Sequence, residues 1–485
     1  MEKNYKSSTT KGIFWMLSER IAAQGVSFIV SVILARMLSP DDYSVVSIVA
    51  IFFAFANLII YSGLNTALVQ KKDVSIEDFS VVLYVNLAVS ILIYVLLFAF
   101  APLIAKLYHK DILVAVFRIM GLILIINAFN AVLCSYISSR LEFKKFFFAT
   151  IIGTVISAFV GIAMAKTGFG PWALIAQQMT NITIDTIILF ATTKFKPVFI
   201  FSTERLKPLV RFSWKILVSG LITTIYDESL PLIVGLKFTT TDLAFYAKGK
   251  RFPSLLGNSI SDSISSVIFP IMSKLQDDRE SLLEYTRRFI QVSSFLIFPI
   301  MFGLFAVSDN LVYVLLTEKW MPCSIYLRIF CISCMLNIIQ VGNLQTIKAL
   351  GRSDIVLKLE IIKKSSYAVI ILLVLFFSDR PQMLAICSVF TSLIATAVNT
   401  RPNRYLVGYS YKKQISDIAK NMLLSCIMCV AVFFIGKLGV GKLPLLIIQI
   451  VSGMGIYAGL SLAFNKKCVK AILDYFAELR AGSKA

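Results

Sequence analysis

Charged and polar side chains that recur at helical spacing inside long apolar stretches are the residues most able to do chemistry. They lie within three such stretches, residues 12–38, 209–236 and 242–273. Basic side chains outnumber acidic ones there, and a guanidinium group binds phosphate in a bidentate way, which predicts an anionic, phosphate-bearing substrate. The residues that we predict to contact this substrate are Arg20, Gln24, Lys248, Lys250, Arg251 and Asn258.

A purely structural role is the alternative explanation of these charges. An arginine at the centre of a bilayer costs roughly 2.5–3.5 kcal/mol to insert, so it needs either a wet cavity or a partner. Glu19 is placed to pair with Arg20, and Asp227 with Lys250. The polar faces therefore predict either a cavity or a set of ion pairs between helices.

Catalytic and metal chemistry finds little support in the sequence. The single histidine, His109, lies in a short connection between apolar stretches. Two CxxC pairs, Cys331/Cys334 and Cys426/Cys429, lie within apolar stretches, where cysteine serves as a small packing residue. We expect no catalytic site, no metal site and no cofactor, and the GxxxxGK(S/T) motif that binds nucleotide phosphates does not occur.

The elements that must position the polar residues are membrane-spanning helices. Hydrophobic residues make up 58% of the 485 residues and charged residues only 15%, against about 25% charged residues in a soluble domain. Because a span needs about 20 apolar residues, the chain divides into fourteen expected spans. They lie near residues 12–38, 43–69, 79–105, 113–138, 146–166, 170–192, 209–236, 242–273, 285–307, 324–348, 355–377, 381–402, 416–438 and 443–464. Residues 309–323 are apolar but short, and predict an interfacial segment.

The basic residues orient these spans. An even number of spans puts both termini on one side of the membrane. The chain carries about three times as many Lys and Arg residues on that side as on the opposite side, and such residues accumulate in cytoplasmic loops. Both termini are therefore expected in the cytoplasm. The net charge of +21 follows from these loops, which we expect to face anionic membrane lipids, with no role in nucleic-acid binding.

Two halves of the chain resemble each other. The turn Leu38–Tyr43 has a counterpart at Phe238–Leu243, and Trp15 has one at Trp214. Six spans per copy give both copies one orientation, and repeats with a site at their interface are typical of transporters. We predict that spans one, two, seven and eight line a polar cleft. The predicted division is an N-terminal six-helix lobe, a C-terminal six-helix lobe and two further helices with a cytoplasmic tail, over residues 1–200, 201–405 and 406–485.

The sequence resembles the Wzx-type polysaccharide-transport family, the lipid-linked oligosaccharide flippases of the multidrug/oligosaccharidyl-lipid/polysaccharide (MOP) exporter superfamily. The resemblance covers roughly residues 10–400 and rests on the order and spacing of five motifs. These are Lys11–Trp15, Leu34–Tyr43, Asp242–Arg251, Val267–Asp278 and Gln345–Asp354. Where other members often have a bulkier or more basic turn, this sequence has Thr239–Thr241.

The resemblance implies two parallel six-helix lobes in a V around a central cavity, with two extra C-terminal helices. It implies a flippase in the bacterial inner membrane that works by alternating access. The cargo would be an undecaprenyl-diphosphate-linked oligosaccharide for a lipopolysaccharide O-antigen, a capsule or an exopolysaccharide. Cationic cavity residues of such flippases hold the diphosphate, which supports Arg20, Lys250 and Arg251. A polysaccharide polymerase and glycosyltransferases are the expected partner proteins.

The membrane potential favours export of such a cargo. Moving one negative charge outward across an inside-negative membrane releases roughly 2.3 kcal/mol per 100 mV, so the cargo needs no ATP to leave. Coupling to H⁺ or Na⁺ is a further expectation. The candidate carboxylates are Glu19, Asp185, Asp227 and Asp262.

Two other functions compete with the flippase. A drug or cation exporter of the same fold should have an acid-rich, aromatic cavity, whereas the polar faces here are basic. A membrane enzyme such as a glycan polymerase needs a large outer loop with paired carboxylates, Arg or His. The longest outer connection, residues 308–323, is short and holds only Asp309, Glu318 and Lys319 as charged residues. The sequence therefore favours a transporter.

Overall fold

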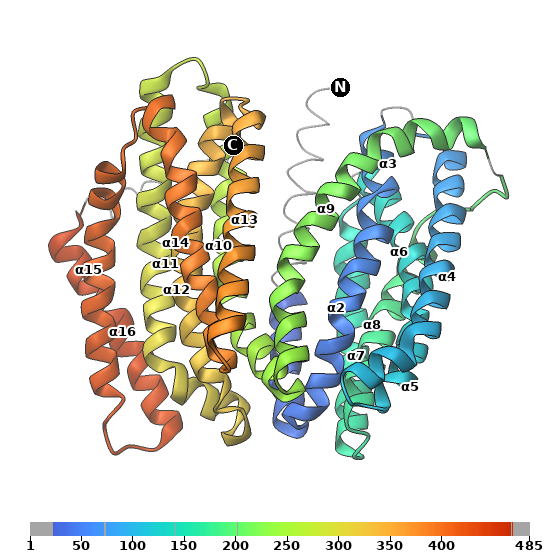
Figure 1. The fold of residues 1–485 in the computed structure, drawn as a ribbon, viewed down its shortest axis with the longest axis horizontal. Helices are drawn as coiled ribbons and strands as arrows, with labels where there is room; N and C mark the ends of the chain where they lie inside the picture. The colour runs from blue at the N-terminus through green and yellow to red at the C-terminus, as the bar shows by residue number, and fades with distance from the viewer. Residues whose placement is uncertain (1–22, 72–73, 141, 201, 467, 469–485) are drawn as a thin grey trace. The chain divides into compact units, whose positions relative to one another are not determined.

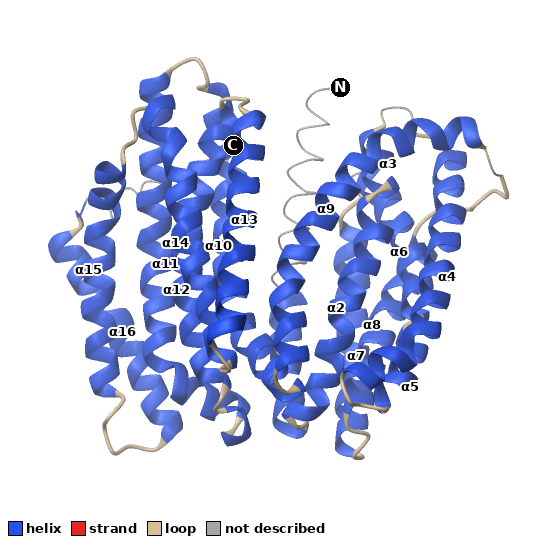
Figure 2. Ribbon diagram, in the orientation of Figure 1, coloured by secondary structure: helices blue, strands red, loops and turns tan. Residues whose placement is uncertain are grey.

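The computed structural model describes the chain except for residues 1–22, 72–73, 141, 201, 467 and 469–485. At positions 62, 262–263, 266–271 and 274 it describes the backbone alone. Within the described residues all regular secondary structure is helical, as Figure 2 shows. The all-α architecture expected from the sequence is therefore confirmed.

The helices follow one another along the chain with short connections (Figure 1). A first helix, Ala23–Met37, precedes them. They are α2 (Pro40–Ser62), α3 (Leu64–Gln70), α4 (Ile76–Leu107), α5 (Ile112–Met120), α6 (Leu122–Ser139), α7 (Lys144–Lys166), α8 (Pro171–Thr192), α9 (Thr203–Lys237), α10 (Thr240–Lys274), α11 (Arg279–Leu316), η1 (Glu318–Trp320), α12 (Cys323–Ala349), α13 (Ser353–Phe377), α14 (Pro381–Leu406), α15 (Tyr411–Ile435) and α16 (Lys442–Phe464).

Eleven candidate spans in the described part of the chain are long and apolar enough to cross a membrane. The helix Ala23–Met37 is apolar but shorter, and α10 and α13 are long enough but are not among these eleven. Together these make the fourteen helices expected from the sequence.

Two of the spans are broken by glycine. Gly63 separates α2 from α3, and Gly121 separates α5 from α6. A Cβ atom at Gly121 would lie 2.5 Å from the ring of Tyr94 on α4, so glycine lets α4 pack closely on the junction of α5 and α6. Each broken pair still counts as one span, because it is long and apolar along its whole length.

The repeated turns begin their helices with the same hydrogen bonds. Ser39 Oγ accepts the Asp42 amide N–H at 3.1 Å, and Asp42 Oδ2 accepts the Ser39 amide N–H at 2.8 Å. Thr239 and Asp242 repeat this pair at 3.0 and 3.2 Å. Such a capping box satisfies two amide groups at a helix start. The second and the eighth span thus begin with the same hydrogen bonds, which Ser75 and Asp78 also form at the start of α4.

The chain divides into two compact units, Met1–Ala244 and Phe245–Ala485. In the first unit α7 packs along α8, α4 packs on α6, and α2 packs on α9. In the second unit α11 packs on α12 and α15, and α14 packs on α12 and α13. The finer division at residues 200 and 405 stays a prediction.

The two C-terminal helices are fastened to the second unit by α11. The Tyr457 hydroxyl of α16 donates to the Phe295 carbonyl at 2.9 Å, and the Asn310 amide donates to Gln449 at 2.8 Å. α11 itself continues to Leu316, so residues 309–316 extend a span and do not form the separate interfacial segment expected from the sequence.

Candidate functional site

The predicted site residues fall on four described helices. Gln24 lies in Ala23–Met37, Asp185 in α8 and Asp227 in α9, all within the first unit. The second unit brings four others together on α10, namely Lys248, Lys250, Arg251 and Asn258. Glu19 and Arg20 lie outside the described residues, and for Asp262 the structure describes only the helical backbone.

Gly249 fixes the direction in which the α10 residues point. A Cβ atom there would lie 2.8 Å from the Cys323 carbonyl oxygen and 2.9 Å from the Leu327 amide nitrogen, so α10 touches the backbone of α12. Arg251 is two residues further on, about 200° around the helix, and is therefore directed away from α12. Arg251 and Asn258 are both exposed and, seven residues apart, share one face of α10.

Lys248 has a different environment from Arg251. Its side chain is buried, with 5% of its surface exposed, and its ammonium nitrogen lies 5.6 Å from the centroid of the Trp320 ring. A cation held over an aromatic face is stabilised by the ring's negative face. Lys248 thus faces the packed interior of the second unit, while Lys250 is half-buried and Arg251 is open.

The first unit holds a second polar cluster, built around the half-buried carboxylate of Asp185. Asn130 of α6 donates its amide to Asp185 Oδ2 at 2.9 Å and to Thr186 Oγ1 at 3.0 Å. Thr150 of α7 donates its hydroxyl to Asp185 Oδ1 at 3.5 Å. The three helices α6, α7 and α8 therefore meet at this carboxylate.

Further side chains extend the cluster to α2. The Tyr61 hydroxyl donates to Asn127 Oδ1 at 3.2 Å and to Asn130 Oδ1 at 3.4 Å. The Asn127 amide in turn donates to Asn57 Oδ1 at 2.7 Å. The sequence analysis identified Asp185 but missed these partners. The signal was present, because Asn57 and Tyr61 are four residues apart and Asn127 and Asn130 three apart within apolar helices.

The chemistry of this cluster suits a proton or a single cation better than a large anion. The donors Asn130 and Thr150 are neutral, and within the described residues the Asp185 carboxylate forms no ion pair. A charged group inside the membrane without a counter-charge is costly. Binding of a proton or a monovalent cation would remove that cost. Groups of three or more His, Cys, Asp or Glu side chains able to hold a metal ion are absent from the described part of the chain.

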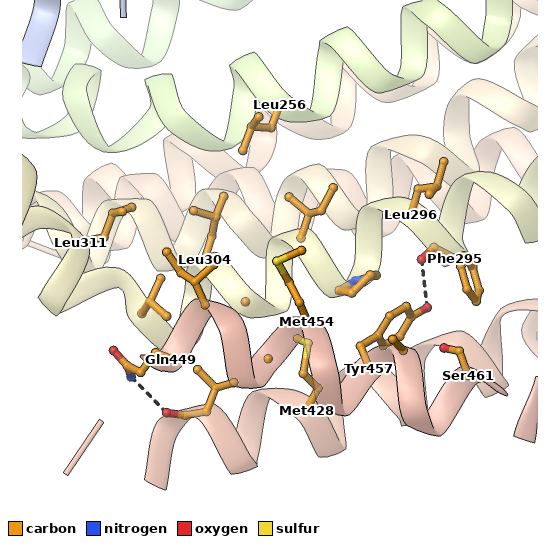
Figure 3. Close-up of a pocket in the computed structure, with 18 of the residues that line it drawn as sticks. Leu256, Phe295, Leu296, Leu304, Leu311, Met428, Gln449, Met454, Tyr457 and Ser461 are labelled. Atoms are coloured by element: carbon orange, nitrogen blue, oxygen red, sulfur yellow. Dashed lines mark hydrogen bonds between the residues drawn. The ribbon is translucent and has the colours of Figure 1, made fainter. Parts of the chain in front are cut away.

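An apolar groove of about 640 Å³ lies within the second unit, between α10, α11, α15 and α16 (Figure 3). Leu256, Leu296, Leu304, Met428 and Met454 point toward it from these helices. Two of its three polar side chains are hydrogen-bonded within the protein: the Tyr457 hydroxyl donates to the Phe295 carbonyl, and the Gln449 amide donates to the Val432 carbonyl at 3.0 Å. The third, Ser461, is buried. The walls therefore present hydrocarbon.

Two glycines provide the room for this groove. Gly303 of α11 and Gly453 of α16 both line it. A Cβ atom at Gly303 would meet nothing nearer than the Met428 methyl group at 3.9 Å. The outer wall is open, since Met454 and Leu462 on α16 are largely exposed. The sequence analysis did not predict the groove, because its residues have the composition of any packed apolar helix.

Residues 33–325 match the family described as "Polysaccharide biosynthesis protein". The chain is 26% identical over 313 residues to the succinoglycan biosynthesis transport protein ExoT of Rhizobium meliloti (strain 1021). That match covers 64% of this chain and 63% of ExoT, so the chain spans slightly less than two thirds of this relative's length. The teichuronic acid biosynthesis protein TuaB of Bacillus subtilis (strain 168) is 24% identical over 394 residues, 78% of this chain and 79% of TuaB.

Solved structures show the same fold. The lipid II flippase MurJ in an inward closed conformation superposes with a TM-score of 0.76 at 16% identity, over 94% of this chain and all of that one. An inward-facing multidrug resistance MATE family transporter of the MOP superfamily superposes with a TM-score of 0.61 at 14% identity. It covers 81% of this chain and 98% of its own. At these identities the likeness establishes the architecture alone.

Proposed function

Because the chain belongs to the polysaccharide biosynthesis protein family, we propose that it carries a polyprenyl-diphosphate-linked oligosaccharide across the bacterial inner membrane. The observation that carries this proposal is the apolar groove between α11 and α16, which suits a long hydrocarbon tail. Each buried CH₂ group of a lipid contributes about 0.8 kcal/mol, so a polyprenyl chain gains much by lying in such a groove. A small water-soluble drug has no long apolar part that could fill such a groove.

The charged end of the cargo is assigned to the basic residues of the polar faces. Arg251 is exposed on α10 with Asn258 on the same face, and Lys250 is half-buried beside it. Guanidinium groups bind phosphate oxygens in pairs of hydrogen bonds, which suits Arg251 and the predicted Arg20 to a diphosphate. Lys248 is buried against Trp320, so we assign it a supporting role in this site and not direct contact with the phosphate.

A multi-pass protein that carries a lipid needs no bond-making step, so we propose a transporter and not an enzyme. The ExoT relative is described as a transport protein, which supports this proposal. Both termini are assigned to the cytoplasm on the strength of the basic loops. Alternating access between the two membrane faces is the proposed mode of transport.

Filling the groove should slow transport of the lipid cargo. Gly303→Phe places a ring into the space that now separates α11 from Met428, so the polyprenyl tail loses its site. We expect about a tenfold fall in the rate of flipping, which corresponds to roughly 1.4 kcal/mol of lost stabilisation. The measurement is the appearance of a fluorescent polyprenyl-diphosphate glycan in the opposite leaflet of proteoliposomes.

The matched control for this variant is Gly455→Phe on α16. A Cβ atom at Gly455 meets nothing within 4 Å, and Gly455 does not line the groove, so the added ring points into lipid. Equal rates for the two variants would show that the groove takes no part in transport.

Ion coupling is assigned to Asp185, the candidate carboxylate whose surroundings the structure describes most fully. Its neutral donors Asn130 and Thr150 hold it in place without neutralising it. Asp185→Asn keeps the shape and removes the charge. Flipping by this variant should no longer respond to a pH or Na⁺ gradient, while Asp111→Asn in an exposed connection should respond as the unchanged protein does. A full response to both gradients in Asp185→Asn would exclude this assignment.

A further inference from the structure

A second cavity of about 320 Å³ lies between the beginning of α13 and the end of α14. It is separate from the apolar groove, which is lined by α10, α11, α15 and α16. Three basic side chains line it, Arg352, Lys358 and Arg401, together with a single acidic one, Asp354. The cavity therefore carries an excess of positive charge.

The basic side chains differ in what they have to bind. Arg352 is committed to Asp354, with two parallel hydrogen bonds of 2.9 Å. Lys358 and Arg401 are exposed, and neither forms an ion pair with another described residue. A lysine and an arginine thus remain to receive an anion from outside the chain.

The rest of the cavity is apolar. Ile355 and Leu359 form its floor, with 7% and 6% of their surfaces exposed. Ile362 also lines it and is 48% exposed, and Leu357 and Ile361, which precede Lys358 and Ile362 in α13, are more than half exposed. A ligand that fits both parts has an anionic head and hydrocarbon chains, because the exposed face of α13 leads from the basic residues toward the middle of the span.

We infer that this cavity binds the phosphate headgroup of an anionic phospholipid. Basic pockets between membrane helices on the cytoplasmic side recognise such headgroups, and each nearby Lys or Arg contributes about 1 kcal/mol. Tyr405, exposed beside the cavity at the end of α14, has the amphipathic ring that settles at the level of the headgroups. The acyl chains then lie along Leu357 and Ile361. The inference does not depend on the cargo that the protein moves.

Lipid retention measured by native mass spectrometry tests the inference. The purified full chain is exchanged into mixed micelles that hold equal amounts of phosphatidylglycerol and phosphatidylcholine. We expect phosphatidylglycerol to be retained about thirtyfold more than phosphatidylcholine, from two basic contacts of about 1 kcal/mol each. Lys358→Ala/Arg401→Ala should remove this preference.

The control is Arg404→Ala/Lys412→Ala, which removes one arginine and one lysine that are exposed but do not line the cavity. It should retain the lipid as the unchanged protein does, and both double variants should keep the unfolding temperature of the unchanged protein. Equal loss in the two double variants would overturn the inference, because it would show a general charge effect.

Two competitors separate the possible sources of the phosphate. Inorganic phosphate at millimolar concentration should leave the bound phosphatidylglycerol in place, since it cannot use the apolar face of α13. Displacement by inorganic phosphate would reduce the cavity to a simple anion site and overturn the lipid assignment. Displacement of the bound phosphatidylglycerol by an equal concentration of polyprenyl diphosphate would assign the cavity to the cargo and overturn the lipid assignment as well.

Discussion

Replacing Arg20 and Arg251 together with alanine is expected to abolish transport while the protein still inserts into the membrane. A hydrogen bond to a charged group contributes about 1.5–3 kcal/mol, so the loss of two arginines removes about 3–6 kcal/mol from the diphosphate complex. That loss lowers the flipping rate by about a hundredfold or more. The measurement is flipping of the labelled glycan lipid in proteoliposomes with matched amounts of protein.

Arg211→Ala/Arg404→Ala removes two exposed arginines from α9 and α14 and serves as the control. It should flip at nearly the rate of the unchanged protein. Replacing the alanine substitution at this position by Arg251→Lys should recover only part of the flipping rate, because the lysine ammonium is a point charge and lacks the planar fork of arginine. Full transport by the Arg20→Ala/Arg251→Ala protein would refute the assignment of the diphosphate to these residues.

Asp417→Ala is expected to cause the largest loss of stability. The Asp417 carboxylate, with 4% of its side chain exposed, accepts hydrogen bonds from Arg287 Nε and Nη2 at 2.8 and 2.7 Å. Gln291 donates to it at 2.8 Å, and so does the hydroxyl of the buried Tyr409. These bonds tie α15 to α11 and to the connection that follows α14.

Removal of the carboxylate leaves the Tyr409 hydroxyl buried without its acceptor and Arg287 without its partner. A broken buried pair costs about 3–5 kcal/mol, and because 43% of the Arg287 side chain is exposed, water takes up part of the loss. We expect the free energy of unfolding to fall by about 3 kcal/mol in a titration with sodium dodecyl sulfate in mixed micelles.

Asp354→Ala is the control for this measurement. Asp354 also makes a bidentate pair, with Arg352, but both side chains are about half exposed. An exposed pair contributes about 0–1 kcal/mol, so this variant should be far less destabilised. Equal and small losses in both variants would show that the Asp417 cluster does not fasten α15 to the second unit.

The spans could be predicted from the sequence because hydrophobicity alone decides them. Runs of apolar residues separated by polar turns define α4, α7, α8 and α16 without ambiguity. The helix starts at Ser39 and Thr239 were also visible, since the acidic residue three positions later is a local signal. Signals of this kind depend only on neighbouring residues, so the packing of the rest of the chain does not alter what they predict.

The side-chain environments of the site could not be predicted to the same depth. Lys248 and Arg251 are only three residues apart on one polar face, yet one is buried and the other exposed. The difference arises from Gly249, which lets α12 approach the backbone of α10. The apolar groove was missed for a related reason: hydropathy cannot distinguish an apolar side chain that packs from one that borders an empty space.

The most direct test of the proposed function is flipping by the purified, unmodified protein. A fluorescent polyprenyl-diphosphate oligosaccharide is placed in one leaflet of proteoliposomes, and its arrival in the other is followed by quenching with an impermeant reagent. The proposal predicts a rate at least about tenfold above that of protein-free vesicles, a difference of roughly 1.4 kcal/mol or more in activation free energy. A rate equal to that of protein-free vesicles, with uptake of a cationic dye by the same preparation, would contradict it and favour a drug exporter of the same fold.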